Sequence, residues 1–257
     1  MTQPILALRG VNKSFGAVQV LHDVDFTVRA GEVTALVGDN GAGKSTLVKC
    51  VAGIHPVDRG EIFFDGEPVH ITSPTDAAKL GIEVVYQDLA LADNLDIVQN
   101  MFLGRERGNP WMLDEAEMEQ AARRTLASLS VRTVTSVRMP VSALSGGQRQ
   151  TVAIAKAVLW DSKVIMLDEP TAALGVAQTR QVLDLVRRLA EQGLGVVLIS
   201  HNMADVFEVS DRIATLYLGR MVADVATKDV THSQVVELIT AGRSGELGLA
   251  RPEAVTI

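Results

Sequence analysis

Residues 38–46 read Gly-Asp-Asn-Gly-Ala-Gly-Lys-Ser-Thr and directly follow the apolar run Val33–Val37. The pattern G-x-x-x-x-G-K-[ST] is typical of a phosphate-binding loop, and four residues match it: Gly38, Gly43, Lys44 and Ser45. The motif needs a buried strand before it and a helix after it, and we expect that helix to begin near Lys44. The stretch therefore predicts the strand–loop–helix unit of a nucleoside triphosphate site.

Each part of this loop has a physical task. Glycines let backbone N–H groups curl around phosphate oxygens, and the helix N-terminus adds roughly half a positive charge. Lys44 adds a full charge, and the Ser45 hydroxyl can reach a Mg²⁺ ion that bridges the terminal phosphates. The residues predicted to contact the nucleotide are Gly38, Asp39, Asn40, Gly41, Ala42, Gly43, Lys44, Ser45 and Thr46.

The length of 257 residues allows a substantial core, as one large domain or one domain with a sizeable insert. Hydrophobic residues make up 47% of the chain, and the mean hydropathy is +0.20. The longest apolar runs have only the length of a strand, well short of the ~20 residues that a bilayer span needs. Parallel strands buried on both faces explain the hydrophobicity.

Charge and cysteine content narrow the class of protein further. The N-terminus lacks the basic and apolar regions of a signal peptide, and the single cysteine, Cys50, excludes an internal disulfide. We expect Cys50 to be a buried packing residue on the helix after the phosphate loop. The net charge of −7 and the pI near 5.3 argue against nucleic acid as the main partner.

The first part of the chain predicts a small antiparallel sheet that leads into the phosphate-loop strand. The expected strands in this part are the apolar runs 5–8, 18–21 and 26–28, followed by the phosphate-loop strand 33–37, with 62–64 as a further candidate. Ser73-Pro74 predicts the start of a short helix that ends at Gly81, and residues 82–86 predict a second buried strand.

Strand signals fade after about residue 88 and return after 161. Between them, residues 96–103, 114–130 and 148–160 are expected to be helices. Strands are then expected at 164–167, 196–199 and 213–218, with a helix over 176–191. Thr231-x-x-Gln234 caps a last helix that closes at Gly242. The alternation of strands and helices predicts an α/β fold with a parallel sheet.

A second motif lies at the end of the strand expected over 164–167, where Asp168 and Glu169 follow directly. Alone, this pair has the appearance of an ordinary loop start. Together with a phosphate loop, one carboxylate can hold hydrated Mg²⁺ while the neighbouring one polarises an attacking water.

A third motif, Leu144-Ser145-Gly146-Gly147-Gln148, stands at the N-terminus of another expected helix, which is again an anion-binding geometry. With these three motifs the chain resembles the ATP-binding cassette (ABC) proteins, whose signature is Leu-Ser-Gly-Gly-Gln. The resemblance runs from about residue 5 to 240 and implies a P-loop NTPase (RecA-like) core with an N-terminal antiparallel subdomain and an inserted helical subdomain.

The resemblance implies roles for individual residues. Phe15 occupies the place of the aromatic ring that stacks on adenine, where the family more often has tyrosine; its alternative is a core position. Gln87 matches the glutamine that touches Mg²⁺ and the attacking water. Asp168 matches the metal-side aspartate, Glu169 the catalytic glutamate, and His201 the histidine that contacts the γ-phosphate.

The family architecture implies a head-to-tail dimer of two copies. Each ATP would lie between residues 38–46 of one copy and Ser145, Gly146, Gly147 and Gln148 of the other. The chain departs from the family at Gly175, where an aspartate that helps to couple the two sites is usual. This departure puts the strength of communication between the sites in doubt.

Three strings resemble the ATPase subunits of bacterial simple-sugar importers: residues 38–46, 86–91 and 100–106. The resemblance implies a membrane permease that docks on residues 87–106, an external (periplasmic) sugar-binding protein, and a peripheral position on the cytoplasmic side of the inner membrane. An importer ATPase for branched-chain amino acids or lipids, or a soluble ABC ATPase outside transport, remains an alternative.

We expect one ABC nucleotide-binding domain over residues 1–242, with its core formed by 1–87 and 162–242 and its helical signature subdomain by 88–161. Residues 243–257 are expected to be a C-terminal tail.

Overall fold

The computed structural model describes residues 3–109, 111–129, 131, 134, 136–245 and 247–248. Six strands form its central sheet, in the order β12-β11-β3-β10-β9-β6. From β11 to β6 neighbouring strands are parallel, and β12 pairs with β11 antiparallel at one edge. Their bounds are β3 (Val33–Val37), β6 (Ile82–Val85), β9 (Val164–Asp168), β10 (Gly195–Ile199), β11 (Arg212–Tyr217) and β12 (Arg220–Ala226).

A second, antiparallel sheet has the order β2-β1-β4-β5. It consists of β1 (Leu6–Phe15), β2 (Val18–Val28), β4 (Arg59–Phe64) and β5 (Glu67–Val69). The expected strands 18–21 and 26–28 were wrong as separate elements, because they are two ends of β2. The polar residues between them lie in a region where the β1–β2 register shifts, with Asp23 in the left-handed region (φ 53°).

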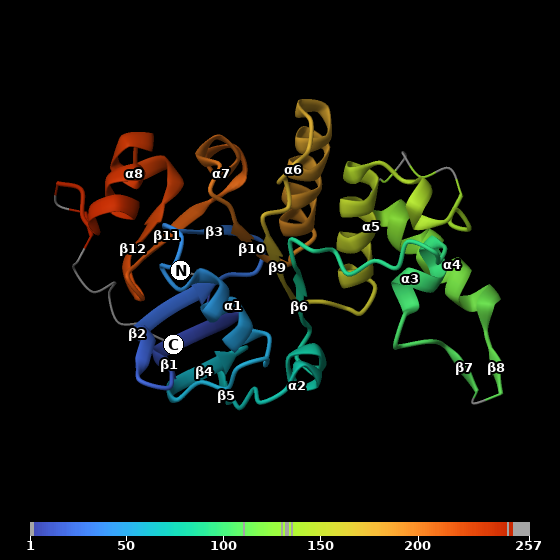
Figure 1. Ribbon diagram of the computed structural model, residues 1–257, viewed down its shortest axis with the longest axis horizontal. Coiled ribbons are helices and arrows are strands. Elements are labelled where there is room, and N and C mark those ends of the chain that lie inside the picture. Colours follow the sequence, from blue (N-terminus) through green and yellow to red (C-terminus); the bar gives the residue numbers. More distant parts are fainter. Residues whose placement is uncertain are drawn as a thin grey trace.

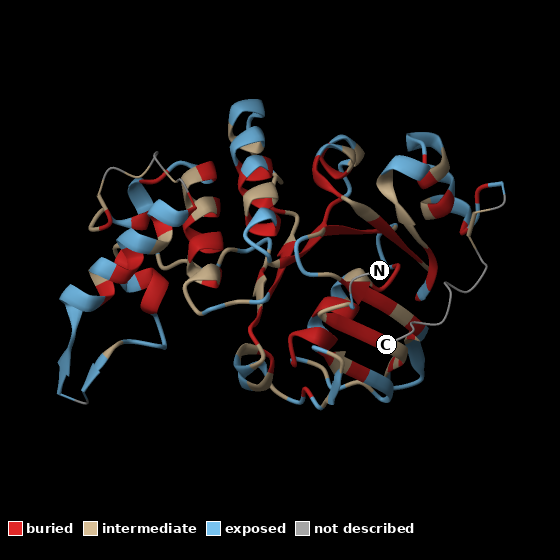
Figure 2. Ribbon diagram, turned by 180° about the vertical axis from the view of Figure 1, so that it is seen from behind, coloured by how far each residue is buried: buried red, intermediate tan, exposed pale blue. Residues whose placement is uncertain are grey.

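Helices cover the central sheet on both sides (Figure 1). Helices α6 (Val176–Glu191), α7 (Met203–Val209) and α8 (His232–Ala241) lie along one side, and α1 (Lys44–Val51) lies on the other with the antiparallel sheet. A short helix α2 (Pro74–Lys79) begins after its N-cap Ser73, as predicted. The strands of the sheet are buried, while the outer end of α6 is exposed (Figure 2).

The segment after β6 is helical, as the sequence predicts. It contains α3 (Ile97–Phe102), α4 (Glu115–Ser128), the 3-10 turn η1 (Val141–Ala143) and α5 (Gly146–Val158). The sequence did not predict the hairpin β7 (Gly108–Asn109) and β8 (Met112–Leu113), which projects from this part (Figure 1). The last residue of the expected helix 114–130 lies outside the described residues.

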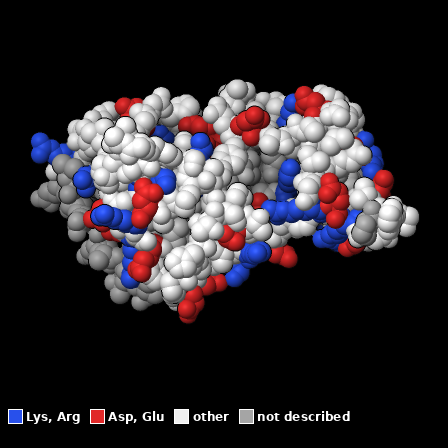
Figure 3. Space-filling view, turned by 60° about the horizontal axis from the view of Figure 1, so that its bottom comes forward, with Lys and Arg blue, Asp and Glu red and all other residues white. Residues whose placement is uncertain are grey.

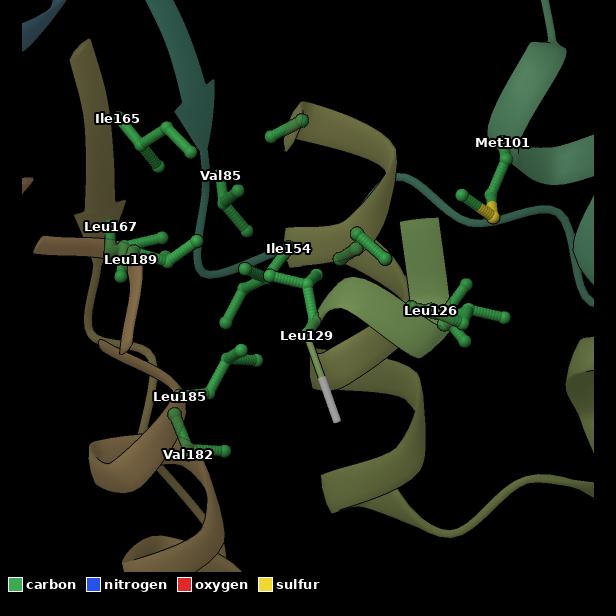
Figure 4. Close-up of a cluster of buried hydrophobic side chains, with 14 of the residues drawn as sticks. Val85, Met101, Leu126, Leu129, Ile154, Ile165, Leu167, Val182, Leu185 and Leu189 are labelled. Carbon is green, nitrogen blue, oxygen red and sulfur yellow. The ribbon is translucent and has the colours of Figure 1, made fainter. Parts of the chain in front are cut away.

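Buried apolar side chains join the helical segment to the central sheet. Leu126 of α4, its C-cap Leu129 and Ile154 of α5 lie in one cluster. Ile165 of β9 and Leu185 of α6 belong to the same cluster, and Figure 4 shows this packing. A second cluster joins the antiparallel sheet to α1 and contains Cys50. Cys50 is fully buried, and burial raises the pKa of its thiol to about 11, which confirms its packing role.

The C-terminal part contains the predicted capping box. Thr231 caps α8 reciprocally with Gln234, and Gly242 closes the helix in the left-handed conformation (φ 75°). The sequence did not predict β12, α7 or the turn η2 (Thr227–Asp229). None of the helices in the described part of the chain has the length and apolarity needed to cross a membrane. The expected tail 243–257 lies largely outside the described residues. Together these elements confirm the predicted fold class, an α/β core with an antiparallel β subdomain and an inserted helical segment.

Candidate functional site

The phosphate-loop motif connects β3 to α1, and glycine is required at two of its positions. A Cβ on Gly38 would lie 2.3 Å from the carbonyl oxygen of Leu216, and one on Gly43 would lie 2.9 Å from Leu21 Cδ2. Gly43 is also the N-cap of α1 and has a φ of 105°. These close approaches hold the loop against β11 and β2, with the start of α1 directed into it.

Lys44 lies over this loop. Its Nζ donates hydrogen bonds to the carbonyl oxygens of Gly38 (2.7 Å) and Asp39 (3.0 Å). Burial lowers the pKa of Lys44, and the negative charges of Glu169, Asp168 and Asp39 oppose that shift. The ammonium group is therefore fixed beside the loop and faces three carboxylates.

The two carboxylates follow β9, next to the phosphate loop. Asp168 is the last residue of the strand, and Glu169 adopts a left-handed backbone conformation (φ 51°) that is uncommon for a non-glycine residue. Burial raises the pKa of Asp168, with a further contribution from the charge of Glu169, while Lys44 and Lys49 oppose the shift. Because β3, β10 and β9 are parallel neighbours, their carboxyl ends meet at one edge of the sheet.

The segment after β10 brings His201 to the same edge. His201 Nδ1 lies 2.8 Å from Glu169 Oε1; the histidine side chain is 76% exposed and the glutamate side chain only 17%. The backbone N–H of Glu169 donates to the carbonyl oxygen of Ile199 at 2.9 Å, which joins the end of β9 to that of β10. Glu169 is therefore held by its backbone and faces an accessible imidazole.

Two adjoining pockets contain most of the predicted site. The first, of about 320 Å³, is lined by Asn40, Gly41, Gly43, Lys44, Ser45, Thr46, Gln87, Asp168 and Glu169, together with Val20 and Ile199. The second, of about 490 Å³, shares Asn40, Gln87 and Glu169 and adds Gly38, Asp39, Ser200 and His201, with Met203, Val236 and Ile239 at its apolar end. Of the predicted loop residues 38–46, only Ala42 lines neither pocket; it is buried within the loop.

The signature residues lie elsewhere. Ser145 caps α5 in a capping box with Gln148, and neither residue, nor Gly146 or Gly147, lines the two pockets. Gly146 instead lines a separate hollow with Gln87 and Glu169. The chain by itself therefore does not bring the signature residues to the phosphate loop.

Phe15 lies at the end of β1, outside both pockets. Its ring is 44% exposed and stands edge-on to His55, with ring centroids 5.0 Å apart. The ammonium group of Lys13 lies 5.6 Å from the centre of the same ring. Phe15 is thus partly exposed at the surface, which a core position would not allow.

Oxygen donors suited to Mg²⁺ are present in the first pocket. Ser45, Gln87 and Asp168 offer a hydroxyl, an amide and a carboxylate oxygen, which are ligand types that this ion accepts. The described residues contain no group of three His, Cys, Asp or Glu side chains that could bind a metal without further ligands. The donor set thus fits an ion that keeps water and phosphate oxygens among its ligands.

Sequence reasoning missed Ser200, which lines the second pocket. Its Oγ accepts a hydrogen bond from the Asn202 backbone N–H at 3.0 Å, and Asn202 in turn caps α7. This arrangement fixes the backbone on both sides of His201. The sequence signal was a polar Ser-His-Asn string between a buried strand and a short helix.

Together, the fold and the site define a phosphate-loop ATPase. Residues 21–172 match the family model described as "ABC transporter". The chain is 45% identical to a xylose/arabinose import ATP-binding protein of Sulfolobus acidocaldarius, over 95% of this chain and 97% of that protein. It is 47% identical to a fructose import ATP-binding protein of Rhizobium meliloti, over 94% of this chain and 95% of that protein.

Among solved structures, a nucleotide-free ATP-binding cassette of an ABC transporter superposes with a TM-score of 0.82. Its identity to the chain is 26%, over 94% of this chain and all of that one. The chain therefore belongs to the ABC transporter family, as an ATP-binding subunit that hydrolyses ATP.

Proposed function

We propose that this chain hydrolyses ATP to power the import of a simple sugar through a partner permease. The support for the solute class is the similarity, over nearly the full length of both chains, to relatives named for xylose/arabinose and fructose import. The structural observation that carries the chemistry is the Glu169–His201 contact at the edge of the phosphate-loop pocket.

Glu169 is the general base that orients the attacking water, and His201 contacts the γ-phosphate. The low exposure of Glu169 and its backbone bond to Ile199 support this role, because a base must be held within hydrogen-bond reach of its proton. Lys44 and the N–H groups of residues 38–46 hold the phosphates, and Phe15 stacks on the adenine. Bound Mg²⁺ neutralises charge on the phosphates, and Ser45, Gln87 and Asp168 would hold it.

Two copies of the chain act together, head to tail. The signature residues Ser145–Gln148 line neither pocket of their own chain, which supports a site completed by the partner copy. The N-terminus of α5 would then supply its helix-end charge to the γ-phosphate held on the phosphate loop of the other copy.

The permease docks on residues 87–106. Asn100 fixes this segment internally, and Arg105 Nη1 ties its end to Glu83 Oε1 of β6 at 2.7 Å. Figure 3 shows a hollow between the central part and the helical part, with both basic and acidic side chains near its rim. A cytoplasmic helix of the permease in this hollow would move when ATP closes the dimer.

The chain acts at the cytoplasmic face of the membrane, as a peripheral subunit, and an external binding protein delivers the sugar to the permease. The nucleotide-binding domain extends over residues 1–242, with the helical signature subdomain at 88–161. The packing of α3, α4 and α5 on one another, with α5 against β6, supports this division.

The test replaces the chromosomal gene with one that encodes Glu169→Gln and measures uptake of labelled xylose, arabinose, fructose and ribose. Uptake of one of these sugars should fall to the level of a deletion strain. Purified Glu169→Gln should bind ATP but turn it over about 100-fold more slowly or worse. Normal turnover would contradict the role of Glu169, whereas lost turnover with all four uptakes intact would contradict the sugar assignment alone.

A further inference from the structure

One buried carboxylate near the site has no role in the chemistry above. Asp205, in the first turn of α7, is 5% exposed. Among the residues that the structure describes, it is the one buried acidic residue. Its Oδ2 accepts a hydrogen bond from Thr171 Oγ1 at 2.6 Å. Burying a carboxylate costs free energy that an apolar pair would not, so its position between two segments of the site needs an explanation.

The Thr171 end of this bond lies in the turn that begins with Glu169. Within the turn, Ala172 N–H donates to Glu169 O at 3.1 Å and Leu174 N–H to Thr171 O at 3.3 Å. Both Glu169 (φ 51°) and Ala173 (φ 59°) are in the left-handed region. Two such residues in one short turn persist only when surrounding contacts hold them.

The Asp205 end of the bond lies in the segment that carries His201. The turn after β9 and the segment after β10 are therefore joined by two side-chain contacts. One is the exposed Glu169–His201 contact, which lies where substrate must enter. The other, Thr171–Asp205, is part-buried with Asp205 itself buried, so it can persist while the first rearranges.

We propose that Asp205 is a positioning residue: through Thr171 it holds the turn 169–175 in the conformation in which Glu169 reaches the attacking water. The proposal rests on the catalytic role proposed for Glu169. The same bond also fixes the position of Gly175, the last residue of this turn, relative to His201.

The test uses Thr171→Val, which keeps the side-chain shape and removes the donor, and Thr171→Ser, which restores it. Thr171→Val should lower kcat for ATP about tenfold or more and leave KM within about twofold, because a misplaced group costs rate rather than binding. Thr171→Ser should keep the wild-type kcat. Thr34→Val is the matched control, because the Thr34 hydroxyl is buried without a hydrogen-bond partner.

The double variant Thr171→Val/Asp205→Leu separates positioning from fold stability. It removes both polar partners, so its Tm should recover relative to Thr171→Val, while kcat should stay low. In hydrogen exchange, the amides of Ala172 and Leu174 should exchange about tenfold faster in Thr171→Val, with α1 unchanged.

A double variant with both wild-type Tm and wild-type kcat would overturn the proposal, as would Thr171→Val with unchanged kcat and exchange. Glu169→Gln is measured alongside these variants. If it retains turnover, the proposed function fails; if it loses turnover while Thr171→Val does not, only the positioning role fails.

Discussion

Asn100 forms hydrogen bonds with the backbone of Ala92 through both polar atoms of its side chain. Its Nδ2 donates to the carbonyl oxygen of Ala92 at 3.0 Å, and its Oδ1 accepts from the Ala92 N–H at 2.7 Å. The same Nδ2 also lies within hydrogen-bond distance of the carbonyl oxygens of Leu95 and Asp96. Asn100 is fully buried. Its side chain, on α3, gives the loop after Gln87 the backbone hydrogen bonds that a neighbouring strand would otherwise provide.

Replacing this side chain should destabilise the protein strongly. Asn100→Leu leaves the Ala92 N–H without its partner and removes one hydrogen bond from each of three carbonyl oxygens, which keep backbone donors. We expect a loss of about 3 kcal/mol in the free energy of unfolding. Urea unfolding measures it. Asn94→Leu, at an exposed position of the same loop, is the control and should change stability by less than about 0.5 kcal/mol. Equal losses of unfolding free energy in the two variants would show that the Asn100 hydrogen bonds do not stabilise the loop.

Gly38 lies so close to the backbone of β11 that it leaves no room for a side chain. A Cβ there would stand 2.3 Å from the Leu216 carbonyl oxygen, whereas Gly41, also at positive φ (82°), has open space around it. Gly38→Ala should therefore lower both stability and ATP affinity, and Gly41→Ala should cost only about 1 kcal/mol of backbone strain. Thermal unfolding with and without ATP compares them. If Gly38→Ala were as stable as Gly41→Ala, β11 would have to move away from the added Cβ at little cost, and the prediction would be wrong.

The ionised carboxylate of Asp168 should lower the free energy of unfolding at neutral pH. Its folded-state pKa is raised above the unfolded value of 3.8, mainly by burial and then by the charge of Glu169. The folded state therefore binds the proton more tightly, and stability falls as pH rises from 3.8 through the folded-state pKa. Asp168→Asn lacks this penalty, so it should have the higher Tm at pH 7.

The matched measurement is the difference in Tm between wild type and Asp168→Asn at several pH values. The difference should be largest near pH 7 and should shrink as the pH falls toward 3.8. The same variant should lose the Mg²⁺-dependent part of its ATP affinity. A Tm for Asp168→Asn below that of wild type at pH 7 would mean that the attraction of Lys44 and Lys49 outweighs burial.

Local signals predicted those parts of the fold whose ends are set by neighbouring residues. Ser73 and Thr231 cap the helices that the sequence assigned to them, and Asp96 and Asp114, expected as first helical residues, are N-caps. Ser145 caps α5, which begins at Gly146, two residues before the expected start. The helix over Val176–Glu191 has the predicted bounds. Capping bonds reach only two or three residues along the chain, so a sequence contains them in full.

The elements that were missed depend on contacts distant in the chain. In β2, polar residues resembled a turn, but Asp25 accepts from the Gly10 N–H and keeps the strand paired with β1. In β12, Asp224 interrupts the apolar pattern, yet its carboxylate pairs with Arg212 of β11 at 2.7 Å. The Thr171–Asp205 bond likewise exists only because parallel strands bring two loops together.

The last prediction concerns Gly175, which begins α6 without a side-chain cap. Its backbone N–H donates to Gln178 Oε1 at 2.9 Å, and its φ of −75° suits any residue. Gly175→Asp should therefore fold normally and gain a few tenths of a kcal/mol, because an aspartate at this position can accept from the helix N–H groups. If the family's aspartate couples the two ATP sites, the variant should also raise the Hill coefficient of ATP hydrolysis. Gly175→Ala, which adds a side chain without a cap, is the control. A higher Tm with an unchanged Hill coefficient would confine the effect of this residue to the helix, and the usual aspartate would then not strengthen coupling in this chain.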